Sequence, residues 1–185
     1  MWSDQIKDKR IIVIVGPSGS GKTTIGEELS ELGYKKLVTT TTRKPRSGES
    51  EAVDYYFRER HELDRDDFVE QTEYNGNIYG LTKQEVKEAL SNHDIVHVSL
   101  DRNGAKAIKN TYPDQAVIIF ITISEEEMIN RMIKRGDSAA VINDRITHCR
   151  QTGELIEPEG TDYVVQNHDF KKAVSDILNI IKKLN

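Results

Sequence analysis

The sequence predicts an α/β fold in which a parallel β-sheet is flanked by helices. Four short apolar runs have the length of buried strands, and they lie at residues 11–15, 95–100, 116–123 and 163–165. Stretches with helical periodicity separate these runs. Strands of parallel sheets are covered on both faces, so they read as continuous apolar runs rather than as alternating ones. With 185 residues, the chain is long enough to bury one sizeable core.

The first apolar run leads into the motif GPSGSGKT, which fits the phosphate-loop pattern G-x-x-x-x-G-K-[ST] and is followed by the helical segment IGEELSEL. Its glycines let backbone N–H groups turn toward phosphate oxygens, and the helix N-terminus adds partial positive charge. Lys22 can reach the outer phosphates and Thr23 can ligate Mg²⁺. A glycine turn that only linked a strand to a helix would need neither residue. The expected residues of this nucleoside triphosphate site are Gly16, Pro17, Ser18, Gly19, Ser20, Gly21, Lys22, Thr23 and Thr24.

Residues 39–81 differ in sequence pattern from the rest of the chain. Short alternating pieces such as DYYF, FVEQTEY and NIYGLT, with a turn at Asn75-Gly76, predict a small antiparallel insertion into the α/β core. The threonines at 39–42 favour a strand end because β-branched side chains suit extended backbone. Arg43 and Arg46 follow, and Pro45 stiffens the segment between them. These two guanidinium groups could face one anion; an exposed basic loop is the alternative.

The second half of the chain is mainly helical between its strands. Thr82 with Glu85, and Ser124 with Glu127, have the spacing of capping boxes that open helices. Residues 125–155 are charged and helical, and Gly136 can end one helix and let the next leave at an angle, as the hinge of a lid would require. The last segment repeats apolar residues at helical spacing, so one of its faces should pack on the sheet.

Composition argues against several classes of protein. The chain carries 26 Lys and Arg against 31 Asp and Glu, a net charge of −5, which speaks against a nucleic-acid or anionic-membrane surface. It lacks an apolar run of about 18 residues, and the stretch MWSDQIKDKR lacks the apolar core expected of a signal peptide. We therefore expect a cytoplasmic protein. Cys149 is the only cysteine, which excludes an internal disulfide, and we expect the His148–Cys149 pair at the surface rather than in a metal site.

With the phosphate loop, TTRKPRSGE, DYYF and NIYG in this order, the chain resembles the guanylate kinase family along nearly its whole length. The resemblance implies a P-loop NTPase core that carries a small domain for the acceptor nucleoside monophosphate and a helical lid. The implied core comprises residues 1–38, 82–124 and 156–185. The GMP-binding insertion would be 39–81 and the lid 125–155.

The resemblance also assigns an acceptor site. The matching positions are Thr39, Arg43, Arg46, Glu49, Tyr55, Glu70, Tyr79 and Asp101. In the family, the arginines and tyrosines bind the phosphate of GMP and the glutamate after the turn orients the arginines. Glu70 would accept from guanine N1–H and the exocyclic amino group, and Thr39 would lie near O6. Asp101 could hold Mg²⁺ through water or contact the base; alternatively, it only begins the next helix.

The expected catalytic residues are Lys22 and Arg43 and, as the resemblance implies for the lid, Arg131, Arg135 and Arg145. The attacking oxygen belongs to an ionised phosphate, so positioning and charge neutralisation carry the catalysis, without a strong general base. Arg131 and Arg135 lie four residues apart on one helical face. Asn167 matches a family position near the adenine of ATP.

Two positions depart from the family pattern, and three functions follow as alternatives. Leu81 replaces a hydroxyl residue that meets the base, and Ser99 replaces the first acid of an acid-x-acid motif. The first function is a guanylate kinase that converts GMP and ATP to GDP and ADP with Mg²⁺. The second is a kinase for another phosphorylated acceptor, either a nucleotide or a sugar phosphate. The third is a non-catalytic binding module, which has no need of Lys22 and Thr23.

Overall fold

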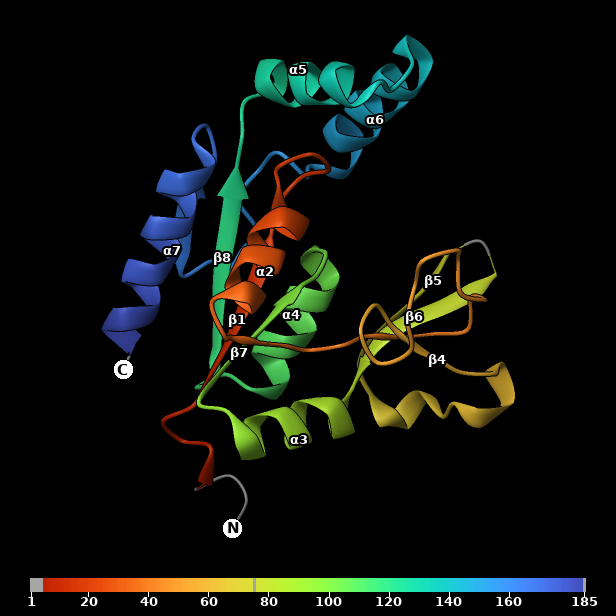
Figure 1. The fold of residues 1–185 in the computed structure, drawn as a ribbon, viewed down its shortest axis with the longest axis vertical. Helices are drawn as coiled ribbons and strands as arrows, with labels where there is room; N and C mark the ends of the chain where they lie inside the picture. The colour runs from red at the N-terminus through yellow and green to blue at the C-terminus, as the bar shows by residue number, and fades with distance from the viewer. Residues whose placement is uncertain (1–4, 75, 185) are drawn as a thin grey trace.

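The structure is a computed structural model that describes residues 5–74 and 76–184. Its larger sheet has five parallel strands in the order β2-β7-β1-β8-β9 (Figure 1). The strands are β1 (Arg10–Val15), β2 (Lys35–Lys36), β7 (Ile95–Ser99), β8 (Ala116–Thr122) and β9 (Tyr163–Gln166). Each of the four predicted apolar runs therefore forms a strand, and the predicted α/β class is confirmed.

Helices cover both faces of this sheet. They are α2 (Lys22–Glu31), α3 (Lys83–Asn92), α4 (Arg102–Thr111) and α7 (Phe170–Leu184). Ile11 and Val13 of β1 pack in one cluster with side chains of α3 and α4, and Ile12 and Ile14 pack in another with side chains of α2 and α7. All four are fully buried, and the burial of each side chain contributes about 1.5–3 kcal/mol to the free energy of folding. The predicted packing of the last helix is confirmed, since Ile177 is fully buried on the sheet.

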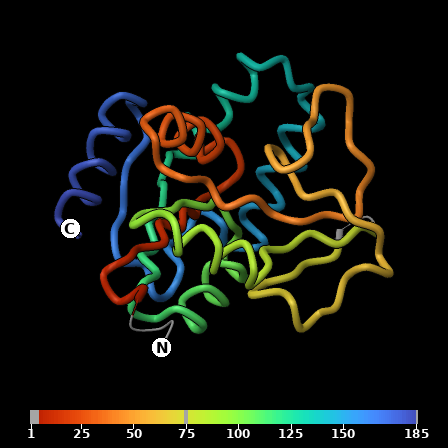
Figure 2. Tube along the Cα trace, turned by 60° about the horizontal axis from the view of Figure 1, so that its bottom comes forward, coloured from red at the N-terminus to blue at the C-terminus, as the bar shows by residue number. Residues whose placement is uncertain are grey.

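A second sheet lies on the opposite side of the larger sheet from α7 (Figures 1 and 2). Its order is β4-β3-β6-β5, with β3 (Thr40–Thr41), β4 (Tyr56–Phe57), β5 (Phe68–Tyr74) and β6 (Asn77–Thr82). The pairs β3–β6 and β5–β6 are antiparallel as predicted, but β3 and β4 run parallel. The sheet is therefore mixed rather than purely antiparallel, because residues 42–55 form a long return connection instead of a hairpin. The predicted Asn75-Gly76 turn includes Asn75, which lies outside the described residues.

Glu85 links the second sheet to the core. Thr82 caps α3 by accepting from the Glu85 backbone N–H at 3.2 Å, as predicted. The Glu85 side chain does not complete a capping box within the described residues. Its two oxygens instead accept from the backbone N–H of Val38 and the hydroxyl of Tyr56, both at 2.9 Å. One buried carboxylate thus joins the segment that enters the second sheet to the helix that leaves it.

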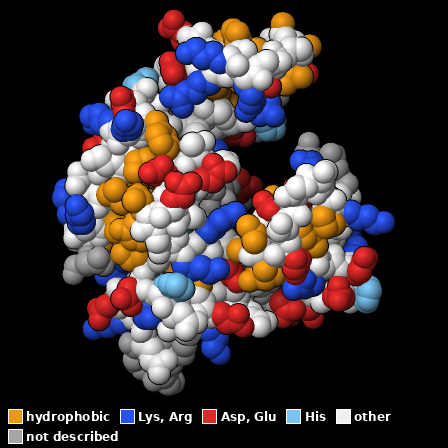
Figure 3. Space-filling model, viewed as in Figure 1, with side chains coloured by type: hydrophobic (Ala, Val, Ile, Leu, Met, Phe, Trp, Pro, Cys, Tyr) orange, Lys and Arg blue, Asp and Glu red, His pale blue; other side chains and the backbone are white. Residues whose placement is uncertain are grey.

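Two further helices extend past the carboxyl end of the larger sheet: α5 (Glu125–Arg135) and α6 (Ala139–Thr152) (Figure 1). Gly136 ends α5 with φ 90°, as predicted, and Ser124 caps its start by accepting from the N–H of Glu127 at 3.1 Å. Met128, Met132, Ile146 and Cys149 form a small apolar cluster between the helices. A wide cleft separates the α5–α6 pair from the second sheet (Figure 3). None of the helices in the described ranges has the length and apolar composition of a membrane span.

Candidate active site

The phosphate loop connects β1 to α2 at the carboxyl end of the sheet. The neighbours of β1 in the sheet are β7 on one side and β8 on the other. The loop therefore lies where the strand order reverses, and α/β sheets bind ligands at this position. Gly21 caps α2 with φ 91°, and a Cβ there would lie 2.4 Å from Nδ2 of Asn167. Glycine is therefore required both by the backbone conformation and by the close neighbour.

Lys22 is folded back over the loop. Its Nζ donates to the carbonyl oxygens of Gly16 at 2.6 Å and Pro17 at 3.0 Å. Burial lowers the pKa of Lys22, and the nearby charge of Glu154 partly opposes that shift. The loop thus holds its ammonium group beside the backbone that would surround a phosphate. Thr23 and Thr24 are exposed in the first turn of α2.

Asn167 and Arg131 support the loop from outside. The buried amide of Asn167 donates to the carbonyl of Ser20 at 2.7 Å. Arg131 donates to the backbone carbonyl of Asn167 and, through Nε, to Glu127 at 3.1 Å. Arg131 also lies near Gly21. The structure therefore places Asn167 against the loop backbone, and its contact with adenine stays a prediction.

The other two predicted arginines of the α5–α6 pair differ in their partners. Arg145 donates to the hydroxyl of Ser18 in the phosphate loop at 2.6 Å. Arg135 instead pairs with Asp137, which follows the Gly136 cap of α5. The Arg135 hydrogen bond lowers the pKa of Asp137, and the charge of Arg145 adds to this effect. Arg131 and Arg145 are thus already at the loop, whereas Arg135 is held by its own helix end.

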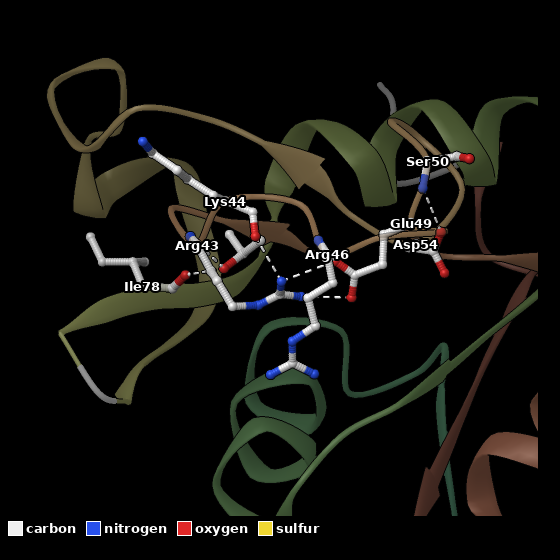
Figure 4. Close-up of polar contacts among 8 residues, drawn as sticks. Arg43, Lys44, Arg46, Glu49, Ser50, Asp54 and Ile78 are labelled. Atoms are coloured by element: carbon white, nitrogen blue, oxygen red, sulfur yellow. Dashed lines mark hydrogen bonds and ion pairs between the residues drawn. The ribbon is translucent and has the colours of Figure 1, made fainter.

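Arg43 and Glu49 form the centre of the acceptor loop (Figure 4). Two nitrogens of Arg43 donate to the two oxygens of Glu49 at 2.9 and 2.7 Å, and the backbone N–H of Arg46 donates to the same carboxylate at 2.7 Å. The Arg43 guanidinium also lies 5.5 Å from the ring centre of Tyr55, which packs edge-on against Tyr79. The Arg46 guanidinium is exposed and points away from Glu49 (Figure 4).

Glu70 and Asp101 line one cavity of about 310 Å³ between β5 and α4. Burial raises the pKa of Glu70 to about 7, and the charge of Asp101 adds to this shift. Asp101 also caps α4 by accepting from the N–H of Gly104 at 2.8 Å. The helix-starting role considered for Asp101 is therefore present, and its carboxylate lies beside Glu70. Its role as a Mg²⁺ ligand stays a prediction.

Three positions near the expected base site have different surroundings. Thr39 is half-buried just before β3. Leu81 is fully buried in the core, with 0% of its surface exposed. It packs in the same cluster as apolar side chains of α3 and α4. Ser99 is exposed at the end of β7. Where the resemblance expects a hydroxyl for the base, the chain therefore has an apolar core residue.

Glu154 was not predicted from the sequence, yet it contacts the phosphate loop. Its carboxylate accepts from the backbone N–H of Ser18 and from the thiol of Cys149, both at 3.3 Å. Cys149 is buried, so the expectation of a surface pair is wrong for the cysteine, although His148 is exposed. Burial raises the pKa of Cys149 to about 11. No local pattern could identify Glu154, because 136 residues separate it from Ser18.

Comparisons with known proteins identify the family. A family model described as Guanylate kinase matches residues 8–184. Guanylate kinase of Fusobacterium nucleatum subsp. nucleatum is 36% identical over 178 residues, covering 93% of this chain and 95% of that protein. Guanylate kinase of Prochlorococcus marinus subsp. pastoris is 34% identical over 181 residues, covering 94% and 97%.

Solved structures give the same result at the level of the fold. The crystal structure of guanylate kinase from Anaplasma phagocytophilum has a TM-score of 0.66 and 29% identity, covering 95% of this chain and 85% of that chain. A gluconokinase from Sinorhizobium meliloti 1021 has a TM-score of 0.51 at 19% identity, covering 95% of both chains, and shows only a shared fold. Because the family model and the relatives extend over nearly the whole sequence, this chain belongs to the guanylate kinase family.

Proposed function

We propose that the protein transfers the γ-phosphoryl group of ATP to GMP, giving GDP and ADP. The observation that carries the proposal is that one chain of this family has two clusters of donor groups, each of which could bind a phosphate. One is the phosphate loop with Lys22; the other is the loop in which Glu49 orients Arg43 beside Tyr55. A carboxylate that can read guanine, Glu70, lies in a cavity on the acceptor side.

On the donor side, the loop N–H groups, the N-terminus of α2 and Lys22 would bind the phosphates of ATP. No group of three or more His, Cys, Asp or Glu side chains in the described part of the chain is arranged to hold a metal ion. This fits Mg²⁺, which keeps several waters and is often bound through one or two protein ligands and substrate phosphates. The exposed hydroxyl of Thr23 would be a ligand from the protein, and Asp101 could hold the ion through water. Mg²⁺ would neutralise charge on the phosphates.

On the acceptor side, Arg43 and Arg46 would bind the phosphate of GMP, with hydroxyls from Tyr55 and Tyr79. Glu49 already fixes the Arg43 guanidinium, so little side-chain freedom is lost when the phosphate binds. Ionised Glu70 would accept from guanine N1–H and the exocyclic amino group. Thr39 would lie near O6, and Asp101 would contact the base beside Glu70.

For transfer, the acceptor phosphate oxygen attacks the γ-phosphorus in line, and the bond to the ADP oxygen breaks. Lys22, Arg43, Arg131 and Arg145 would surround the transferring group and stabilise its charge. Arg135 would have to break its ion pair with Asp137 before it could bind the nucleotide. We assign residues 125–155 as the lid that carries these arginines, 39–81 as the GMP-binding insertion, and 1–38, 82–124 and 156–185 as the core.

A second candidate function is phosphoryl transfer to a different phosphorylated acceptor. The observation that favours it is that position 81 holds a buried leucine, which has no hydroxyl where the resemblance expects one to meet the base. A site that loses one buried hydrogen bond can lose much of its selectivity, since discrimination based on such bonds reaches about 10⁴ or more. Ser99 is the other altered position.

The test is turnover in a coupled assay with Mg-ATP and one acceptor at a time: GMP, dGMP, IMP, AMP, CMP, UMP or ribose 5-phosphate. A wide preference for GMP over IMP, which lacks the 2-amino group, supports guanylate kinase activity with Glu70 as the reader. A preference for another acceptor supports the second candidate. If no acceptor is phosphorylated, both enzyme proposals fail.

A further inference from the structure

Glu154 places a carboxylate at the phosphate loop. It accepts from the backbone N–H of Ser18 at 3.3 Å, and its charge acts on Lys22. A loop N–H and the loop lysine are the groups that a phosphate loop offers to phosphate oxygens. The carboxylate of Glu154 therefore interacts with the same groups that the phosphates of ATP would use. Its side chain is 28% exposed, so it lies at the mouth of the loop rather than deep in the core.

The segment that carries Glu154 is fixed from two sides. Its backbone N–H donates to the carbonyl of Cys149 at 3.0 Å, which holds it against the end of α6. The preceding Gly153 ends α6 with φ 68°, and its carbonyl accepts from the guanidinium of Arg102 at the start of α4. A core helix therefore anchors the residue next to Glu154. The thiol of Cys149, which donates to the carboxylate at 3.3 Å, and Nε2 of His148, 3.5 Å from its other oxygen, hold the side chain at the loop.

Arg145, on α6, makes a second contact to the same loop residue, since it donates to the hydroxyl of Ser18 at 2.6 Å. The two contacts differ in what a triphosphate would do to them. Arg145 is a cation and gains a partner when phosphates arrive. Glu154 is an anion that accepts from the backbone N–H of Ser18. Phosphates would therefore repel it and compete with it for that N–H group.

We propose that Glu154 is a tethered competitor for the phosphate loop, and that ATP must displace its carboxylate in order to bind. Glu154 thereby lowers the affinity for the donor and contributes to the choice of a ligand with enough negative charge to displace it. The triphosphate of ATP competes better than a singly charged anion does. This inference rests on the proposed role of the loop as the donor site.

The experiment measures the dissociation constant of Mg-ATP by calorimetry for the wild type, Glu154→Gln and Glu157→Gln. Glu154→Gln keeps an oxygen that can accept from Ser18 but removes the charge, and we expect it to bind Mg-ATP about 3- to 10-fold more tightly. Glu157→Gln is the matched control, because Glu157 is exposed nearby and the change in net charge is the same. It should alter the constant less than about 2-fold. The gain of Glu154→Gln should shrink at high salt.

Unchanged or weaker binding of Mg-ATP by Glu154→Gln overturns the proposal; weaker binding would mean that the carboxylate supports the bound state. Glu154→Ala is the second variant, and it should also bind more tightly if its thermal unfolding is cooperative. Lys22→Ala separates this inference from the proposed function. If Lys22→Ala binds Mg-ATP as the wild type does, the donor-site assignment fails; if it loses binding and Glu154→Gln changes nothing, only the role of Glu154 fails.

Discussion

The carboxylate of Glu49 holds the guanidinium of Arg43 through two hydrogen bonds of 2.9 and 2.7 Å. Both side chains come from one loop, and the backbone N–H of Arg46 donates to the same carboxylate. The Arg43 hydrogen bonds are the main reason that the pKa of Glu49 is lowered. The loop is therefore preorganised around one ion pair, and the exposed guanidinium of Arg46 points away from it (Figure 4).

We predict that Arg43→Ala raises the KM for GMP about 10- to 100-fold, because hydrogen bonds between charged groups are the strong ones. The KM for ATP should change little, since Arg43 lies in the acceptor loop. Steady-state kinetics with each substrate varied in turn checks this. Glu49→Gln should raise the KM for GMP less than Arg43→Ala does, because the guanidinium remains but loses its orientation. Equal weakening of both substrates in Arg43→Ala would contradict the assignment.

Lys22→Ala should lower kcat by about 10²–10³-fold, since the ammonium stabilises charge that develops on the transferring group. Lys87→Ala is the matched control, because this lysine is exposed on α3 and should leave kcat near the wild-type value. Rapid-quench measurement of a single turnover separates the chemical step from product release. Normal single-turnover rates in Lys22→Ala would remove Lys22 from the mechanism.

The affinity for GMP should depend on the ionisation of Glu70. The pKa of Glu70 is raised to about 7, mainly by burial, so below that pH the free enzyme carries a protonated Glu70. Only the ionised form accepts from both guanine donors. The KM for GMP should therefore rise as the pH falls below about 7 and level off above it.

Glu70→Gln is the control for this profile. GMP also titrates through its own phosphate, and that contribution is common to both enzymes. The difference between the two pH profiles isolates Glu70. A wild-type profile that parallels that of Glu70→Gln would show that the ionisation of Glu70 does not govern binding.

His97 should make the fold less stable in acid. It is buried on β7, with Nε2 3.1 Å from the hydroxyl of Ser30, and burial lowers its pKa to about 4. His97 of the unfolded chain thus binds a proton near pH 6.5, whereas His97 of the folded chain stays neutral at that pH. Stability from this group is present above the unfolded pKa and is lost as the pH falls from about 6.5 to 4.

Between about pH 7 and pH 5, His97 should account for a loss of about 2 kcal/mol in the free energy of unfolding. Urea denaturation of the wild type and of His97→Gln at both pH values measures the difference. The variant is expected to be less stable at neutral pH but to lose less on acidification. An equal loss in both proteins would assign the acid sensitivity to other groups.

Sequence reasoning could predict what periodicity and local motifs encode. The strands appear because runs such as IIVIV leave no polar face, and Gly136 ends its helix as its position indicates. The parallel pairing of β3 with β4 could not be predicted, because it depends on the path of a long loop. The link from Glu154 to Ser18 was missed for a similar reason, since it joins residues far apart in the sequence.

Glu85 shows the same limit, because its spacing to Thr82 predicts a capping box whereas its side chain bridges two parts of the fold. We predict that Glu85→Ala lowers the free energy of unfolding by about 2–4 kcal/mol, since it leaves the buried Val38 N–H and Tyr56 hydroxyl without their acceptors. The matched control is Glu88→Ala, an exposed position on the same helix, which should change stability by less than about 0.5 kcal/mol. Urea denaturation measures both. The KM for GMP should also rise in Glu85→Ala, because this carboxylate fixes the entry to the second sheet; similar stability of the two variants would mean that the bridge contributes little.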